Sequence, residues 1–351
     1  MAGTTLADII TPACAPVSET LFKGYLINCG EGSLWGSSLV KEDMRATDTA
    51  MGNSLTQAHP FYERQDNSID MNVLDLNVQD CPEASGIRQQ AMTMRKFSGS
   101  KLYREEYSAT FLMACSQDDP LKVIMDDVVS YDWMRIYTGI VMSMLRGLYE
   151  HVRTNFPGEQ DYDATTAEAI QAGGTSSLNN IHVNFAKNLF ACDQLGGLIT
   201  HQQQATTMEN LGLLSCPCID DQGSRVFEMQ DGTSTTVIRD PAIKPFLELD
   251  NGKFLNILYR TGAILYGEGC HPKPMTLDEE ECANNGDGAL TLYTRRRFSL
   301  HPDGFSFSGL DGTGGGFNAL VPTNAELQNP NVYERVVPVD FQPFVFIVSE
   351  A

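Results

Sequence analysis

Apolar positions recur at three- and four-residue spacing across residues 120–155, the clearest periodic pattern in the chain. Two aspartates at 118–119 are candidate N-terminal caps, Pro120 suits the first position of a helix, and Pro157 ends the pattern. We therefore predict one helix over about 120–155, roughly 50 Å long at about 1.5 Å per residue. Such a helix is about three times as long as the mean helix of a globular protein.

Alternating apolar and polar positions predict extended structure before this helix. Residues 60–94 alternate at Ile69, Met71 and Val73 and then shift register at Leu74, as a β-bulge would cause. We expect two extended arms around polar turns. The returning arm is basic within an acidic chain, and its cationic residues are Arg88, Arg95, Lys96, Lys101 and Arg104.

Residues 165–288 predict a compact unit that mixes helices and strands. Apolar periodicity indicates two helices with a short buried strand between them, and an Asp-Gly turn at 231–232 indicates a hairpin. After Gly288 a strand pattern returns, so the flanking segments must pair across a long sequence gap. An inserted second domain, or a fold with long arms, would do this. The predicted helices are 183–197 and 202–214, and the predicted strands lie within 198–201, 225–240 and 253–267.

The composition argues against nucleic-acid binding, membrane spanning and secretion. The chain has 24 Lys and Arg against 45 Asp and Glu, a net charge of −21, which argues against a general nucleic-acid binder. A hydrophobic content of 42 % is ample for a core. Apolar runs such as 344–348 are too short to span a bilayer, and the first 22 residues lack the basic region of a secretory signal. We therefore expect no membrane partner.

Nine cysteines are scattered along the chain, and this odd, irregular set predicts free thiols in a reducing compartment. An alternative is a zinc site formed by Cys216 and Cys218 with Cys270, His271 and Cys282. A C-x-C pair bends poorly around one tetrahedral ion, so buried free thiols are the favoured interpretation.

Other candidate catalytic features are weaker. His201 follows the predicted strand at 198–201 and could act as a base, but no G-x-S-x-G elbow accompanies it. The glycine-rich run 309–317 lacks the Gly-Lys-Ser/Thr ending of a phosphate loop, which favours a flexible loop. Acidic pairs such as Asp126-Asp127 are typical of solvated faces. We therefore predict no catalytic residue, no cofactor and no metal.

Three consecutive arginines, Arg295–Arg297, stand in a predicted strand. Because alternate residues of a strand share a face, Arg296 lies with Leu292 and Phe298, whereas Arg295 and Arg297 lie with Tyr293. A groove for nucleic acid would need more basic neighbours than the nearby sequence supplies. The expected partners of these arginines are therefore carboxylates, from this chain or from a second copy of it.

The chain resembles the major capsid proteins of tailed bacteriophages, an α+β family built on the Hong Kong 97 fold. The likeness covers most of the length and lies in the order of several stretches, none of which is a signature motif alone. These stretches are LADIITPACAPVSETLFKGYLINCG at 6–30, DDPLKVIMDDVVSYDWMR at 118–135, LITHQQQATTMENLGLL at 198–214, GAILYGEG at 262–269, RRRFSLHPDGFSF at 295–307 and PTNAELQNPNVYERV at 322–336.

The resemblance implies a division of the chain into an N-terminal arm, an extended β-hairpin loop, a peripheral domain with a long spine helix, and an axial domain. The boundaries that it implies are 1–59 for the arm, 60–95 for the loop, 96–164 for the peripheral domain with its spine helix at about 120–155, 165–288 for the axial domain, and 289–351 for the returning strands of the peripheral domain and the C-terminus.

The function implied by the resemblance is that of a major capsid protein, which is not an enzyme. It would self-assemble through pentamers and hexamers into the icosahedral shell around the double-stranded DNA genome of a tailed phage. The implied partners are further copies, a scaffolding protein, the portal, a decoration protein where one exists, and packaged DNA contacted without sequence specificity. The implied location is the virion, after assembly in the host cytoplasm.

Within this interpretation, charged residues of the loop, the spine helix and the arginine strand are expected to form contacts between subunits. The candidate residues are Arg88, Arg95, Lys96, Arg104, Asp126, Asp127, Glu150, Arg295, Arg296 and Arg297. Two alternatives stay open. One keeps the fold and makes the protein an encapsulin-type nanocompartment that stores an enzyme. The other is a thiol- or zinc-dependent hydrolase that uses Cys216, Cys218, Cys270 and His271.

Overall fold

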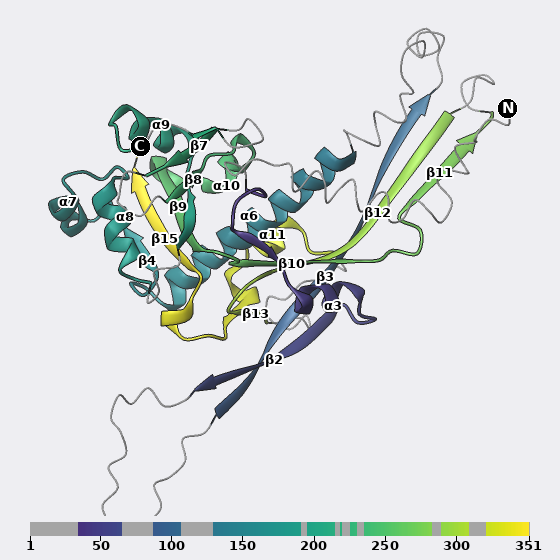
Figure 1. The fold of residues 1–351 in the computed structure, drawn as a ribbon, viewed down its shortest axis with the longest axis horizontal. Coiled ribbons are helices and arrows are strands. Elements are labelled where there is room, and N and C mark those ends of the chain that lie inside the picture. The colour runs from purple at the N-terminus through teal and green to yellow at the C-terminus, as the bar shows by residue number, and fades with distance from the viewer. Residues whose placement is uncertain are drawn as a thin grey trace, which may run out of the picture.

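A computed structural model describes residues 34–64, 87–106, 129–190, 195–214, 218–219, 225–229, 235–282, 289–308 and 321–350. These residues form an α+β fold with two main sheets. A packed body holds one sheet, and two narrow projections of the other sheet extend away from it in opposite directions (Figure 1). Within the described ranges, no helix has the length and apolar character needed to cross a membrane.

The long helix predicted from the apolar spacing is α6 (Val129–Asn155), and the earlier part of that prediction, 120–128, lies outside the described residues. Gly147 allows another segment to approach α6 closely, because a Cβ at this position would lie 2.3 Å from the carbonyl oxygen of Leu327. Tertiary packing of this kind supports a helix that also contains glycine. Side chains of α6 that are at most 1 % exposed include Trp133, Tyr137, Val141, Leu145 and Leu148.

A seven-stranded sheet forms the centre of the body, in the order β4-β15-β9-β5-β8-β7-β6. Its middle strands are buried at nearly every residue because both faces are covered. Side chains on one face pack in the same cluster as those of α6, and side chains on the other pack with those of α8 and α9. The strands are β4 (Asp161–Asp163), β5 (Leu195–Ile199), β6 (Cys218–Ile219), β7 (Arg225–Glu228), β8 (Thr236–Ile238), β9 (Lys253–Arg260) and β15 (Phe344–Glu350).

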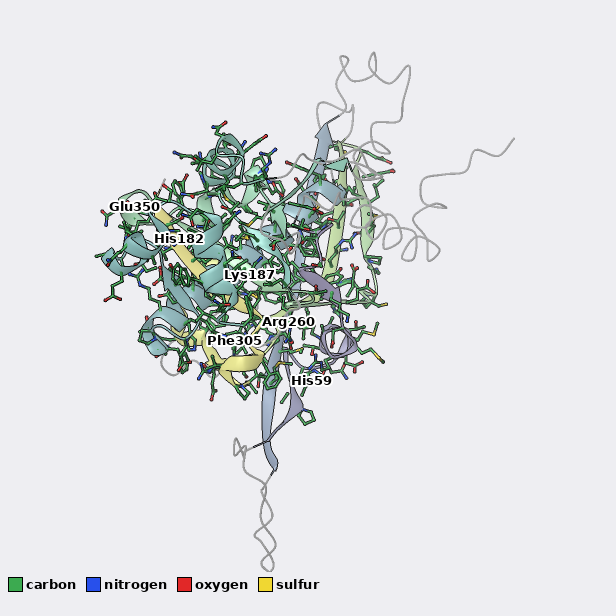
Figure 2. All side chains as sticks on the ribbon, turned by 60° about the vertical axis from the view of Figure 1, so that its left-hand side comes forward. His59, His182, Lys187, Arg260, Phe305 and Glu350 are labelled. Carbon is green, nitrogen blue, oxygen red and sulfur yellow. The ribbon has the colours of Figure 1, made fainter. Side chains whose placement is uncertain are left out.

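Helices and short strands complete the body. His182 on α8 and Glu350 at the end of β15 both lie there (Figure 2). The helices are α7 (Ala167–Gly173), α8 (Asn180–Lys187), α9 (Gln202–Asn210), α10 (Lys244–Leu247) and α11 (Asn324–Leu327); the 3-10 turns are η2 (Pro241–Ile243), η3 (Asp250–Gly252), η5 (Pro330–Val332) and η6 (Val339–Phe341); and a two-stranded sheet pairs β13 (Phe305–Phe307) with β14 (Tyr333–Arg335).

The second sheet has six strands in the order β1-β10-β12-β3-β2, with β11 also paired to β12. The 20-residue strand β3 runs through both projections: its first half pairs with β2 and its second half with β12 (Figure 1). The lower projection, where His59 lies, is the β2–β3 pair (Figure 2). The strands are β1 (Val40–Glu42), β2 (Thr56–Arg64), β3 (Ile87–Glu106), β10 (Ile264–Gly269), β11 (Met275–Glu280) and β12 (Ala289–Pro302).

The helix α3 (Met44–Met51) lies against the six-stranded sheet at β10. Two glycines of β10 make room for it: a Cβ at Gly267 would lie 2.1 Å from the backbone nitrogen of Thr47, and one at Gly269 would lie 2.5 Å from the carbonyl oxygen of Ala50. Asp43 caps the start of α3 by accepting a hydrogen bond from the Arg45 N–H at 2.8 Å. This end of the sheet is therefore covered.

One predicted helix is too long. The prediction over 183–197 is wrong at 188–190 and at 195–197, because α8 ends at Lys187 and Leu195 already begins β5; residues 191–194 lie outside the described residues. The reason is a close backbone approach that apolar spacing does not reveal: a Cβ at Gly197 would lie 2.5 Å from the Tyr259 hydroxyl oxygen of the neighbouring strand. The helix over 202–214 is confirmed in its main part as α9, and 253–267 contain β9 and the first four residues of β10.

Strand pairing links segments on the two sides of residue 289, where the resemblance implies a boundary. β10 and β11 precede residue 289, yet they pair with β12 in the six-stranded sheet. β15 follows residue 289, yet it pairs with β9 in the seven-stranded sheet. The chain therefore leaves the body sheet between Arg260 and Ile264, and its last strand returns to it.

Candidate functional site

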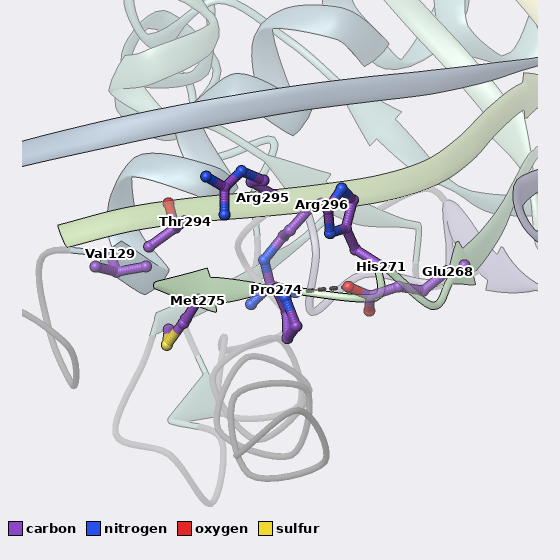
Figure 3. A pocket seen from close by; sticks show the side chains of 9 residues that line it. Val129, Glu268, His271, Pro274, Met275, Thr294, Arg295 and Arg296 are labelled. Carbon is purple, nitrogen blue, oxygen red and sulfur yellow. Dashed lines mark hydrogen bonds and ion pairs between the residues drawn. The ribbon is translucent and has the colours of Figure 1, made fainter. Parts of the chain in front are cut away.

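The arginine run lies on β12, where its three side chains divide between the two faces as the strand period predicts. Arg296 is only 8 % exposed, and its Nη1 donates a hydrogen bond to Glu268 Oε1 on β10 at 2.6 Å (Figure 3). Glu268 pairs with Phe298 in the antiparallel ladder, so Arg296 is its diagonal neighbour on the same face. The carboxylate that the sequence predicts for Arg296 therefore comes from the same chain.

Aromatic side chains complete this buried ion pair. The Tyr266 hydroxyl donates to Glu268 Oε2 at 3.0 Å, and the Arg296 guanidinium carbon lies 6.0 Å from the Trp133 ring centroid. Burial raises the pKa of Tyr266, and that of Tyr137 beside it, well above the usual value. Both phenols thus stay protonated and able to donate. The group joins α6, β10 and β12, so it holds the base of the sheet to the long helix.

Arg295 and Arg297 occupy the opposite face, and each is half-buried. Arg295 Nη1 donates to Thr276 Oγ1 at 2.9 Å and to the Lys273 carbonyl oxygen at 3.3 Å, and its guanidinium carbon lies 5.3 Å from the Tyr293 ring centroid. Within the described part of the chain, neither arginine forms an ion pair with a carboxylate. The charges of Arg295 and Arg297 are therefore not neutralised by any carboxylate in the described part of the subunit.

Further basic groups surround this face. The pKa of His271 is lowered, first by burial and then by the positive charges of Arg297 and Arg295. The pKa of Lys96 is lowered by burial and by Arg297. The Lys96 ammonium donates to the carbonyl oxygen of Gly52, the C-terminal cap of α3, where a cation is favourable. The lowered pKa leaves His271 neutral at pH 7, so the local concentration of positive charge comes from Arg295, Arg297 and Lys96.

The hollow beside the arginines is small. It is lined by residues of α6, β10, β11, β12 and the β10–β11 connection, which include Glu268, His271, Met275 and Thr294 (Figure 3). Its volume of about 10 Å³ holds about one water molecule, whereas ligand pockets span about 300–1,000 Å³. The geometry therefore suits structural packing rather than the binding of a substrate.

The other predicted contact residues fall into three groups. Arg95 is 4 % exposed and Lys96 is 8 % exposed, so both side chains make their contacts mainly inside the subunit. Glu150 lies on α6 with its side chain 38 % exposed, and its Oε1 is 3.4 Å from Arg146 Nη2. Arg88 and Arg104 stand on β3, but their side chains lie outside the described residues, as do Asp126 and Asp127 entirely.

The candidate catalytic residues are also placed. His201 caps the start of α9, accepts from the Gln203 N–H at 3.2 Å and stacks on Phe254 at 4.4 Å, which is a structural role. Cys270 and Cys282 are both exposed, so the expectation of buried thiols is wrong at these two positions. Cys216 and the run 309–317 lie outside the described residues, as does the side chain of Cys218. Among the residues that are described, no three His, Cys, Asp or Glu side chains gather as metal ligands would.

Sequence reasoning missed Glu268, the partner of Arg296. One signal could have found it: Glu268 is the single charged residue in the strand Ile264–Gly269, whose other members are apolar, aromatic or glycine. A carboxylate in such a strand needs a cation, because an unpaired buried charge is costly.

No family model matches this chain, and no curated protein matches it either. Solved structures do match. The capsid of Ralstonia phage GP4 is 8 % identical, with a TM-score of 0.53 over 92 % of this chain and 92 % of that chain. The capsid asymmetric unit of Cyanophage Pam1 is also 8 % identical, with a TM-score of 0.49 over 90 % of this chain and 89 % of that chain. The likeness to the GP4 capsid shows the fold: this chain has the α+β, Hong Kong 97-type capsid fold that its sequence predicts.

Proposed function

We propose that this chain is the major capsid protein of a tailed bacteriophage, and that its copies assemble through pentamers and hexamers into an icosahedral shell around double-stranded DNA. The observation that carries the proposal is the shared fold with the GP4 capsid over 92 % of both chains. The likeness therefore spans most of both chains. A fold alone does not determine a function, so the residues of the candidate site must also be consistent with a structural role.

The site agrees with a structural role. The arginine strand adjoins a hollow of about 10 Å³, too small for a substrate, and it offers two half-buried cations to something outside the subunit. The net charge of −21 suits a container for DNA, because an acidic wall repels the packaged polymer. We infer a protein without catalytic activity and a DNA contact without sequence specificity.

The proposal extends to partners and place. Copies of the chain would contact one another through the charged residues predicted above, of which Arg295, Arg297 and Glu150 are exposed enough to take part. A scaffolding protein would guide assembly in the host cytoplasm, a portal would occupy one vertex, and the finished protein would reside in the virion. A decoration protein is a further candidate partner.

The test is the particle size of the purified chain, expressed alone and with the scaffolding protein of its phage, by light scattering and negative-stain microscopy. We expect closed shells tens of nanometres across, or rings of five and six copies. A monomer or dimer that never assembles would overturn the proposal. Shells that hold a copurifying enzyme, and never DNA, would replace it with the encapsulin alternative.

A further inference from the structure

The upper projection is a ribbon of β3, β12 and β11, and no other described element packs against one of its faces. Along β12, residues from Thr291 to Phe298 alternate between half-buried and buried. The buried set faces α6. On the other face, Ser98 and Ser100 are exposed and Leu102 is 54 % exposed. We call this the outer face of the ribbon. By ladder register its side chains come from Ser98, Ser100 and Leu102 of β3, Thr276, Asp278 and Glu280 of β11, and Thr291, Tyr293, Arg295 and Arg297 of β12.

Charge is divided along the outer face. Arg295 and Arg297 lie at its inner end, close to Lys96 and His271. The far end is acidic: β11 finishes in consecutive exposed carboxylates, at Asp278, Glu279 and Glu280, and an exposed Glu281 follows. Asp278 pairs with Thr291, four residues before Arg295 on β12. At about 3.3 Å per residue this is a backbone spacing of roughly 13 Å. The Arg295 guanidinium extends toward Thr276, and within the described residues Asp278 forms no ion pair with Arg295 or Arg297.

We propose that the outer face binds the outer face of a second copy, so that Arg295 and Arg297 of one copy lie against Asp278 and Glu280 of the other. This inference rests on the proposed function and names the partner of its arginine strand. The occupant follows from charge complementarity: each copy carries both signs on one face, so a second copy matches it and a uniformly acidic partner does not. A nucleic acid would be repelled by the acidic end.

The contact also has an apolar component. Leu102 and Tyr293 occupy neighbouring positions between the two charged ends, because Tyr293 pairs with Leu102 in the ladder. Exposed ion pairs are individually weak and are screened by salt, so burial of these two side chains would supply much of the attraction, and the charges would set the orientation.

Charge reversal tests this arrangement. The double variant Arg295→Glu with Arg297→Glu makes the whole face acidic, and Asp278→Lys with Glu280→Lys makes it basic. We expect each to fold, as circular dichroism and thermal unfolding would show, and to lower the yield of shells or rings at least tenfold. The chain that carries all four changes has a complementary face again. We expect it to recover most of the wild-type yield.

A control separates position from net charge. Lys41→Glu with Lys244→Glu changes the net charge as much as the arginine pair, at exposed sites away from the ribbon, and should assemble as wild type does. Should a reversed variant misfold, Arg295→Gln with Arg297→Gln replaces it; assembly should then lose most of its salt dependence.

The outcomes distinguish the two proposals. If the wild type never assembles, the proposed function fails. If the wild type assembles and the arginine variants assemble equally well, the inference about the outer face fails while the function stands. If both double variants fail to assemble and the fourfold variant does not recover, the two charged ends meet something other than each other, and the inference is likewise overturned.

Discussion

The two sheets bury their strands in different ways. In the seven-stranded sheet, β15 is buried at every residue from Phe344 to Ser349, and β9 from Phe254 to Tyr259. In the six-stranded sheet, β12 is buried only at alternate positions between Thr291 and Phe298. The first sheet finds partners for both faces inside the subunit. Among the described residues, the ribbon part of the second sheet has α6 on one face only, and its other face is the one that we propose binds a second copy.

The largest expected difference between the sheets is in the free energy of unfolding. Phe346 on β15 is fully buried, and its ring centroid lies 5.8 Å from that of Tyr149 on α6. Replacing a buried phenylalanine by alanine typically costs about 3–5 kcal/mol, so we expect Phe346→Ala to lose about this much in urea denaturation. The matched change in the ribbon, Leu102→Ala, removes a side chain that is 54 % exposed and should cost about 0.5 kcal/mol or less.

Similar losses at the two positions would break the comparison, because they would mean that the ribbon contributes to the stability of the single chain as much as the body does.

A smaller effect is expected where the ribbon joins the body. Glu268→Gln keeps a hydrogen-bond acceptor for Arg296 but removes the charge that compensates a guanidinium only 8 % exposed. We expect a loss of about 2–3 kcal/mol, measured by the same denaturation. The control is Glu150→Gln on α6, which breaks an ion pair with Arg146 whose carboxylate is 38 % exposed. Exposed pairs of this kind contribute at most about 0.5 kcal/mol.

Equal losses for the two glutamine variants would show that burial does not distinguish these ion pairs. That result would undermine the assignment of Arg296 to the subunit interior and would return it to the set of contact residues.

Local periodicity predicted the features that depend on neighbouring residues. The apolar spacing predicted α6, and the period of two predicted that Arg296 lies on the other face from Arg295 and Arg297. What could not be predicted depends on distant pairing. Glu268 is 28 residues from Arg296, and nothing in the sequence marks the two as ladder neighbours. In the same way, the apolar run at 344–348 predicts a buried strand, but only the structure shows that this strand, β15, pairs with β9.

The close approach of two strands was missed for a related reason. Gly196 and Gly197 lie at the end of an apolar pattern that is typical of a helix. They are needed as glycines because a Cβ at either position would collide with Tyr259 on the neighbouring strand. The need for glycine therefore comes from Tyr259 on the partner strand, and the spacing of apolar residues around 196–197 does not indicate it.

The smallest expected change in the free energy of unfolding is a gain in stability, and it follows from a comparison of two buried carboxyl groups. In the ribbon, Glu268 has Arg296. In the body, Asp161 on β4 has an Oδ1 that is buried without a hydrogen-bond partner in the described structure. Burial raises the pKa of Asp161 to about 6, against a partial opposing effect of Arg153. At neutral pH the folded protein therefore carries a carboxylate that its surroundings disfavour.

We expect Asp161→Asn to stabilise the protein by about 1–2 kcal/mol at pH 7, less than the full pKa difference implies because the group is partly exposed to solvent. A raised pKa means that the folded state binds this proton more tightly than the unfolded state, so the wild type is relatively most stable below about pH 4 and loses that advantage as the pH rises to about 6. The variant has no such titration. Its gain should be near zero at pH 4, grow through this window and be constant above it.

The neighbouring change Asp163→Asn should instead destabilise the protein, because Asp163 accepts from the Thr165 N–H at 2.9 Å and lies 3.9 Å from the Lys253 ammonium. A loss of stability in Asp161→Asn at pH 7 would mean that the carboxylate has a stabilising partner in the folded chain, and the contrast with Glu268 would disappear.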